Sequence, residues 1–210
     1  MSFRGLVIIG LTIPIFLLMG SSAIFSGRTA ILSPESNFDM PPHLLGNLQD
    51  GDVILRKGNT LLSELIALNF PDAEGMSHCG FIFKIDNHYQ VIHTISKSLS
   101  DIDGIRMSPL EDFIRDAKQN RICIIRYYKE LNSAAMKEKC LILLKQQIPF
   151  DDDFDLNDSS RMYCSELLRQ IYLDEGEKDF FQKRKIAGVS VIDLSTFFNP
   201  KLFTPVYKNY

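Results

Sequence analysis

One short stretch constrains this chain more than any other, because a cysteine stands where an amphipathic helix begins. Residues 161–168 read Arg-Met-Tyr-Cys-Ser-Glu-Leu-Leu and follow a loop of mostly aspartates. Apolar residues recur at helical spacing at Leu167, Leu168, Ile171 and Tyr172. This spacing predicts a helix over about residues 162–173. Cys164 would lie in its first turn, where unpaired N–H groups and the helix dipole favour a thiolate. That position suits a nucleophile, although a small apolar core cysteine looks the same in sequence.

Upstream of this helix, the sequence predicts a β-hairpin that carries two histidines. Residues 77–85 and 88–95 have the composition of strands, and residues 86–87 form an Asp-Asn turn that tolerates positive φ. We therefore expect Ile85 to pair with His88. This pair sets the register of every other pair in the hairpin.

The predicted register places His78 and His93 on the same face of the hairpin. Because side chains alternate across a strand, the two residues would be diagonal neighbours, roughly 7–8 Å apart at the backbone. Gly80 lies opposite His93 and leaves room for its ring. The residues predicted to point the other way, into the core, are Cys79, Phe81 and Phe83. His88 lies beside the turn, and we expect it to be exposed.

Two histidines on one sheet face and a cysteine at a helix start are compatible with two kinds of chemistry. In Cys–His catalysis, one imidazole takes the proton of the Cys164 thiol and the second imidazole orients the first. In a zinc site the same residues would be ligands, but a third or fourth ligand is needed and no pair has zinc-motif spacing. Cys79 would face away from His78. The sequence therefore favours catalysis without a metal, while each histidine alone could also be structural.

The length and charge of the chain set the broad class. Its 210 residues, 45% of them hydrophobic, suit one globular domain. A formal net charge of −3 gives no basic surface that would favour nucleic acid. Residues 27–48 are rich in proline and small polar residues, so we interpret them as a linker in which His43 has no chemical role. We expect the domain to cover residues 49–210.

The N-terminus has the pattern of a targeting segment. Arg4 is followed by an almost wholly apolar run over residues 6–19, and no further charge occurs before Arg28. We interpret residues 1–26 as a signal peptide or an uncleaved signal anchor, because this run can just span a bilayer core of about 30 Å. The predicted location is the periplasm or cell envelope, with residues 5–26 as the anchor to the inner membrane if they are not removed.

Export makes disulfides worth considering for the four cysteines. These are Cys79, Cys123, Cys140 and Cys164. They are scattered without paired spacing, and the chain is too long to need covalent cross-links. We expect free thiols, with the first three on apolar faces of a strand, a strand and a helix.

The remaining predicted elements complete an α+β pattern. Strands are expected over residues 51–56, 105–107, 121–128 and 202–207, and helices over residues 60–68, 110–118, 132–147 and 193–199. The segment Ser108-Pro109-Leu110-Glu111 is predicted to form a capping box. The leucine-rich helix over 60–68 is expected to be core, although such a helix could also line a lipid site. Residues 174–185 are expected to be exposed.

An acidic loop over residues 149–158 raises the question of calcium binding. An EF-hand loop that began at Asp151 would need glycine at its sixth position and glutamate at its twelfth. The sequence has Leu156 and Met162 there. We therefore predict no calcium site in this loop.

Together, these motifs resemble a known family. The matching segments are Gly51-Asp52, Ser77-His78-Cys79-Gly80-Phe81-Ile82, Tyr89-Gln90-Val91-Ile92-His93, Pro149-Phe150-Asp151 and Tyr163-Cys164-Ser165-Glu166-Leu167. They are similar to the circularly permuted branch of the NlpC-type papain-like cysteine hydrolases, the YiiX/YebB-like group, with lecithin–retinol acyltransferase as a more distant relative. In unpermuted relatives the cysteine precedes the histidine, whereas here His78 comes first and Cys164 last. The resemblance covers about residues 48–207.

The resemblance implies a fold and a set of site residues. The implied fold is a small α+β domain in which a curved antiparallel sheet packs against helices and the nucleophile begins the helix that faces the sheet. Cys164 would be the nucleophile, His78 the general base and His93 the third polar catalytic residue. This branch often has glutamate at the third position, so His93 is a departure that is like the histidine of the acyltransferase relatives. Tyr163 and Phe150 are the implied substrate-binding positions, and Phe150 stands where many relatives have tyrosine.

We therefore predict a cysteine hydrolase of the peptidase or amidase type. It would cleave an amide or ester bond in the cell envelope through a covalent acyl-thioester on Cys164. The expected substrate is an envelope peptide, a lipid or an N-acyl amide, with no cofactor, no nucleic acid partner and a monomeric state. Two alternatives stay open: acyl transfer or lipid-directed thioester chemistry at the same site, and a non-catalytic envelope binding module.

Overall fold

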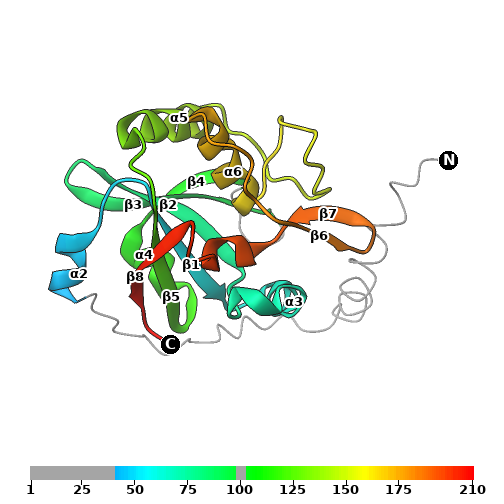
Figure 1. The fold of residues 1–210 in the computed structure, drawn as a ribbon, viewed down its shortest axis with the longest axis horizontal. Coiled ribbons are helices and arrows are strands. Elements are labelled where there is room, and N and C mark those ends of the chain that lie inside the picture. Colours follow the sequence, from blue (N-terminus) through cyan, green and yellow to red (C-terminus); the bar gives the residue numbers. More distant parts are fainter. Residues whose placement is uncertain (1–40, 98–102) are drawn as a thin grey trace, which may run out of the picture.

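The computed structural model describes residues 41–97 and 103–210, and these residues form one α+β unit (Figure 1). The predictions for residues 1–26 and for most of the linker lie outside the described residues. Six strands form an antiparallel sheet in the order β4-β3-β2-β1-β5-β8. The predicted α+β class with a sheet packed against helices is thereby confirmed.

The strands of the main sheet agree with most of the predicted ones. They are β1 (Asp52–Gly58), β2 (His78–Ile85), β3 (His88–Ile95), β4 (Gly104–Pro109), β5 (Ala117–Tyr127) and β8 (Phe203–Lys208). A separate two-stranded hairpin pairs β6 (Lys183–Ile186) with β7 (Val189–Ile192). The sequence analysis did not predict this hairpin and treated residues 174–185 only as exposed chain.

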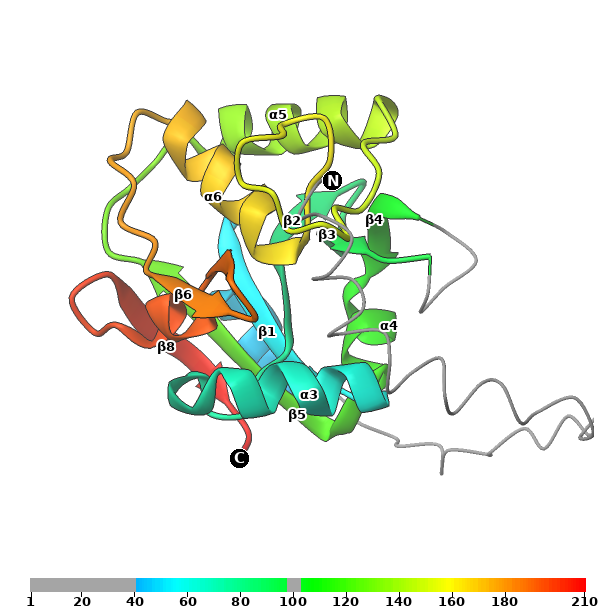
Figure 2. The ribbon, with the colours of Figure 1, turned by 90° about the vertical axis from the view of Figure 1, so that its right-hand side faces the viewer.

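The helices cover both faces of the sheet. They are α2 (Pro42–Asn47), α3 (Leu61–Asn69), α4 (Leu110–Arg115), α5 (Ser133–Lys145) and α6 (Cys164–Asp174), with 3-10 turns η1 (Pro71–Ala73) and η2 (Leu194–Phe198). Figure 2 shows α5 and α6 on one side of the strands and α4 on the other. None of the helices in the described part of the chain is long and apolar enough to cross a membrane.

Two hydrophobic clusters follow from the alternation of side chains along the strands. Odd-numbered residues of β2 such as Cys79, Phe81 and Phe83 are fully buried in the larger cluster, together with the apolar residues of α6. Even-numbered Ile82 packs in the second cluster with Phe113 of α4. The sheet therefore has an α6 face and an α4 face, and its central strands contribute to both.

The histidine hairpin has the register that the sequence predicted. Ile85 pairs with His88, and Phe81 pairs with Ile92. Asp86 and Asn87 have positive φ values of 48° and 63°. A Cβ added at Gly80 would lie 2.9 Å from the Cβ of His93, so only glycine leaves the space that the histidine needs.

Two boundaries differ from the predictions. Leu44 of α2 and the neighbouring Leu48 are buried at 2% and 7% exposure in the second cluster, so the packed domain begins a few residues before the predicted 49. The predicted capping box at residues 108–111 does not form. Ser108 belongs to β4, Pro109 is the N-cap of α4, and no side chain caps that helix. Strand pairing of Ser108 with Val91 directs its hydroxyl toward the hairpin instead.

Candidate active site

Cys164 is the first residue of α6, as the sequence predicted. Tyr163 precedes it in an extended conformation, and its N–H donates to the Glu166 carboxylate at 3.4 Å, which helps to fix the helix start. The side chain of Cys164 is half-buried and packs against the larger core cluster. Its own N–H is one of the first-turn groups that the hydrogen-bond pattern of a helix leaves without a helical acceptor. The position therefore offers a partly accessible sulfur beside a free backbone donor.

His78 is the first residue of β2 and contacts both Cys164 and His93. Its Nε2 lies 2.9 Å from Nδ1 of His93. The other ring nitrogen of His78 is therefore the one left for the sulfur. Burial lowers the pKa of His78, while its hydrogen bond with Cys164 and the charge of that cysteine raise it. The structure thus brings together the predicted nucleophile, base and third residue.

His93 extends this chain of hydrogen bonds to a residue that the sequence analysis missed. Its Nε2 lies 3.1 Å from the hydroxyl of Ser108, and His93 is only 2% exposed. Burial, together with the neighbouring His78, keeps the pKa of His93 well below its ordinary value. His93 is therefore neutral, and the network assigns its proton to Nε2, with Nδ1 accepting from His78. Ser108 escaped notice because its Ser-Pro-Leu-Glu context looks like a helix cap.

Phe113 of α4 forms a hydrophobic base under both imidazoles. Its ring stacks on His78 with centroids 5.5 Å apart and meets the edge of His93 at 5.1 Å. The guanidinium of Arg56 also lies over this ring, 4.2 Å from its centroid, and donates to the Phe113 carbonyl at 2.7 Å. Arg56 also stands directly opposite His78 in the sheet. These contacts shield the imidazole pair on the α4 face.

Cys79 is a second neighbour of the nucleophile that the sequence did not reveal. It points away from the histidine face, as predicted, and is fully buried on the α6 face, where Cys164 packs. A hydrogen bond from the Cys79 thiol, with further ones from His78 and the Cys79 backbone, holds the pKa of Cys164 well below its ordinary value against the opposing effect of burial. Burial and the same contact raise the pKa of Cys79. Cys164 is therefore the thiolate of the pair.

All four cysteines are free thiols, as predicted. Burial raises the pKa of Cys123 to about 11 and also raises the pKa of Cys140. Only Cys164 combines a lowered pKa with partial exposure. This contrast singles it out as the reactive cysteine.

Two buried carboxyl groups lie behind the start of α6. Burial, followed by the charge of Asp151, raises the pKa of Glu166 to about 8. Asp151 is itself fully buried, and burial raises its pKa as well. Glu166 is therefore largely protonated at neutral pH and places little negative charge next to Cys164.

Of the implied substrate-binding positions, Tyr163 directly precedes the nucleophile, and Phe150 is linked to Tyr163 through Phe154. Tyr163 is 4% exposed, and its hydroxyl accepts a hydrogen bond from the Ile192 N–H at 2.9 Å. Phe150 is half-buried and meets the edge of Phe154, which in turn contacts Tyr163. The phenol of Tyr163 thus connects α6 to β7, while substrate contact by either residue stays a prediction.

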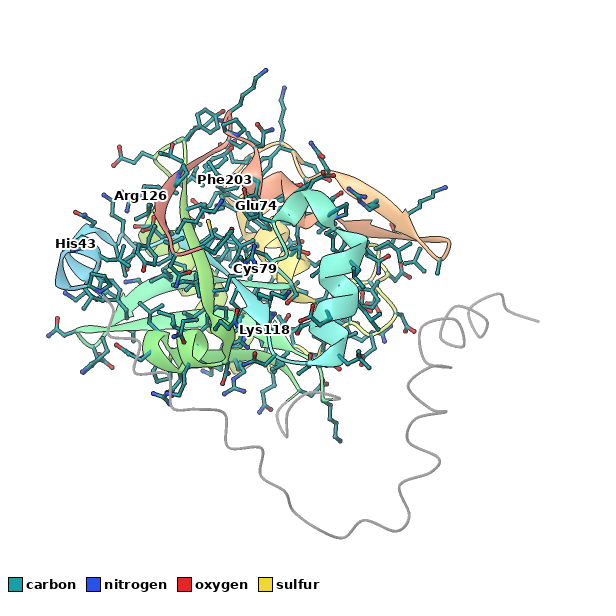
Figure 3. All side chains as sticks on the ribbon, turned by 90° about the horizontal axis from the view of Figure 1, so that it is seen from below. His43, Glu74, Cys79, Lys118, Arg126 and Phe203 are labelled. Atoms are coloured by element: carbon teal, nitrogen blue, oxygen red, sulfur yellow. The ribbon has the colours of Figure 1, made fainter. Side chains whose placement is uncertain are left out.

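The other two histidines lie outside this group. His88 is exposed beside the hairpin turn, and His43 lies on α2, away from Cys79 (Figure 3). Within residues 41–97 and 103–210, no group of three or more His, Cys, Asp or Glu side chains could hold a metal ion.

The chain order of the site residues identifies the class of protein. A helix that begins with the nucleophile packs on an antiparallel sheet, and its histidine partner comes from an earlier strand. This arrangement is that of a circularly permuted papain-like cysteine hydrolase. The model of the family described as "Permuted papain-like amidase enzyme, YaeF/YiiX, C92 family" matches residues 47–199, and the chain belongs to this family. It is therefore a cysteine-type hydrolase of the amidase or peptidase kind.

A solved structure supports the fold. The chain is similar to the crystal structure of the metalloprotein yiiX from Escherichia coli O157:H7, with a TM-score of 0.63 and 17% sequence identity. The similarity covers 78% of this chain and 99% of the other. No curated protein matches the chain. At this identity, the likeness concerns the fold alone.

Proposed function

We propose that this protein cleaves an amide or ester bond in the cell envelope through a covalent acyl-thioester on Cys164. The observation that carries the proposal is the hydrogen-bonded series His78–His93–Ser108 beside Cys164 at the helix start, where His78 helps to lower the pKa of the cysteine. Of the four cysteines, only the one beside this series has a pKa held well below its ordinary value while staying partly accessible.

In the proposed first step, the Cys164 thiolate attacks the substrate carbonyl carbon and forms a carbon–sulfur bond. The resulting oxyanion would accept the N–H of Cys164, which points out of the helix start. The carbon–nitrogen or carbon–oxygen bond then breaks, and His78 gives its proton to the leaving amine or alcohol.

In the second step, His78 takes a proton from water, and the resulting hydroxide attacks the thioester carbonyl. The carbon–sulfur bond breaks, and Cys164 leaves as the thiolate with the carboxylic acid as product. His93 accepts the second N–H of His78 throughout and keeps the ring oriented. A neutral His93 does so less strongly than a carboxylate would, and Ser108 holds it in the required tautomer.

The proposed location in the cell envelope rests on the N-terminal apolar run. Residues 5–26 would export the domain and, if retained, tether it to the membrane. A periplasmic or envelope substrate follows from this placement, whether an envelope peptide, a lipid or an N-acyl amide.

The direct test is the pH dependence of Cys164 alkylation by iodoacetamide, with peptide mapping to separate it from the other cysteines. We expect fast modification at and below neutral pH, which His78→Ala should remove. His88→Ala is the matched control, because His88 lies on the same hairpin but is exposed and distant from the sulfur. If Cys164 reacts no faster than Cys140, or if His88→Ala has the same effect as His78→Ala, the proposed mechanism is wrong.

A further inference from the structure

Helix α3 shows an inverted distribution of polar and apolar side chains. Its only buried residue is Ser63, at 8% exposure. Leu61 and Leu68 are 60% and 75% exposed, and Leu65 is half-buried. Positions i, i+4 and i+7 lie on one face of a helix, so the face of α3 opposite the sheet is a row of three leucines. The expectation that these leucines are core is wrong for this face.

Close packing between α3 and β1 explains the inversion. A Cβ added at Gly58 would lie 2.2 Å from the Ser63 hydroxyl oxygen, so the two backbones approach too closely for a larger side chain between them. Thr60 caps the helix by accepting the Ser63 N–H, and the two hydroxyls lie 2.9 Å apart. A leucine could not replace Ser63 at this closest approach, whereas Ile66 packs partly buried against the larger cluster and leucines line the outer face. Solvent exposure alone gives no reason for that choice.

The start of helix α3 lies close to the catalytic centre in the fold. Helix α3 and turn η1 connect β1, which contains Arg56, to β2, which begins at His78. The N–H of Gly58 donates to the Ser77 hydroxyl at 2.9 Å, so the start of α3 is tied to the residue before the base. Figure 3, seen from below, shows α3 across the near side of the molecule. A surface that covers α3 would therefore lie close to the start of β2, where His78 stands.

We propose that the Leu61–Leu65–Leu68 face of α3 inserts into the surface of a lipid bilayer and brings the active site to an acylated, membrane-embedded substrate. The substrate part of this inference rests on the proposed hydrolase chemistry, whereas the docking part rests on the proposed N-terminal anchor and not on that chemistry.

Two observations favour a bilayer over other occupants. The chain before the described domain carries the apolar run of residues 6–19, and residues 28–40 could extend over at most about 45 Å. A domain tethered this closely would meet the membrane repeatedly. In addition, the only acidic side chain of α3, Glu64, is paired with Lys57 and Lys118 at 3.2 and 2.5 Å. The face thus approaches the bilayer without an unpaired acidic group.

The absence of tryptophan from the whole chain makes a sharp experiment available. The full chain would be reconstituted in phosphatidylcholine vesicles as Leu68→Trp, with a brominated phosphatidylcholine as quencher. We expect a blue-shifted emission and quenching at least about threefold stronger than for Ile142→Trp. Ile142 is the matched control, because it is a 45% exposed apolar residue on α5, which lies far from α3 in both Figure 1 and Figure 2.

Three results would overturn the docking proposal. One is equal or weaker quenching of Leu68→Trp compared with Ile142→Trp. Another is a blue shift without vesicles that grows with protein concentration, which would mean that a second copy covers α3. The last is a blue shift without vesicles that does not depend on concentration, which would mean that another segment of the same chain covers it.

A second measurement separates the substrate claim from the proposed hydrolase function. Hydrolysis of a long-chain nitrophenyl ester in vesicles is compared with that of a short, water-soluble nitrophenyl ester. For Leu68→Glu, we expect the ratio of vesicle to soluble rate to fall about tenfold, while Ile142→Glu keeps the wild-type ratio. An unchanged ratio overturns the substrate claim. If the wild type hydrolyses neither ester, the hydrolase proposal fails, and the tryptophan quenching still decides whether α3 docks.

Discussion

Helices α6 and α3 flank the same catalytic centre but use their side chains in opposite ways. Helix α6 buries its apolar face completely, with Leu168 at 0% exposure, and presents its first residue to the site. Helix α3 buries a serine and exposes its leucines, with Leu68 at 75%. Packing of α6 therefore holds a nucleophile in place, whereas the outer face of α3 is free to contact something else.

The first-turn glutamates of the two helices show the same contrast. Burial raises the pKa of Glu166 in α6 to about 8. Hydrogen bonds from Lys118 and Lys57 lower the pKa of Glu64 in α3. The same residue type in the first turn of a helix is thus neutral in α6 and charged in α3. The position in the helix does not determine whether a glutamate is ionised; the groups packed around it in the folded protein do.

The largest expected effect concerns the start of α6. Cys164→Ala and His78→Ala should each lower kcat by about a thousandfold or more, because each removes a group that makes or breaks bonds. Steady-state hydrolysis of a short nitrophenyl ester provides the measurement, with circular dichroism to confirm folding. A fully active His78→Ala enzyme would show that another base serves Cys164.

The second prediction compares one leucine from each helix. Leu168→Ala should lower the free energy of unfolding by roughly 2–5 kcal/mol, because it leaves a cavity in the core. Leu68→Ala should change it by less than about 0.5 kcal/mol, because the side chain is mostly in solvent. Urea unfolding of both variants gives the two numbers. Equal losses would mean that α3 is packed like α6 in solution.

The third prediction uses the two glutamates. A folded-state pKa raised above the unfolded value of 4.5 contributes stability below pH 4.5, and this is lost as pH rises toward 8. Wild type should therefore lose stability relative to Glu166→Gln between about pH 5 and 8. At about 1.4 kcal/mol per pKa unit, the difference should reach a few kcal/mol.

Glu64→Gln is the control for this prediction, because hydrogen bonds from Lys118 and Lys57 lower the pKa of the Glu64 carboxylate and keep it charged over the same range. The free energy of unfolding is measured with urea at pH 5 and pH 8. Relative to wild type, it should rise between these pH values for Glu166→Gln and stay unchanged for Glu64→Gln. The same pH dependence in wild type and Glu166→Gln would mean that Glu166 is ionised in the folded protein.

The smallest expected effect is that of Ser108→Ala, which acts on Cys164 only through His93 and His78. We expect kcat to fall severalfold and the pH–rate profile to shift, because His93 loses the partner that fixes its tautomer. Ser108→Thr should restore most of the wild-type kcat and most of the wild-type pH–rate profile. A variant that is unfolded or unchanged in pH profile would limit Ser108 to a structural role.

Local sequence rules predicted the parts of the site that depend on near neighbours in the chain. The Asp86-Asn87 turn fixed the hairpin register, and that register placed His78 beside His93 and left Gly80 to make room. The apolar spacing after Cys164 located the helix start within two residues. Each of these depends on a backbone period or a turn type, which the sequence carries directly.

Long-range pairing decided the features that local rules misassigned. Ser108 reads as a helix cap until β4 pairs with β3 and brings its hydroxyl to His93. Residues 174–185 read only as exposed chain, whereas β6 begins within them and pairs with β7 across a two-residue turn, and the Ile192 N–H of this hairpin donates to Tyr163. In both cases the hydrogen-bond partner, His93 or Tyr163, lies at least 15 residues away along the chain.

The sequence by itself determined the α+β class, the hairpin and the residues Cys164, His78 and His93, because periodicity, turn chemistry and helix starts are local properties. Tertiary structure alone decided that Cys79 and Ser108 join this group, that Glu166 is neutral, and that the leucines of α3 face outward. Those outcomes depend on burial and on how closely two backbones approach, as Gly58 and Ser63 do, and neither quantity exists before the chain has folded.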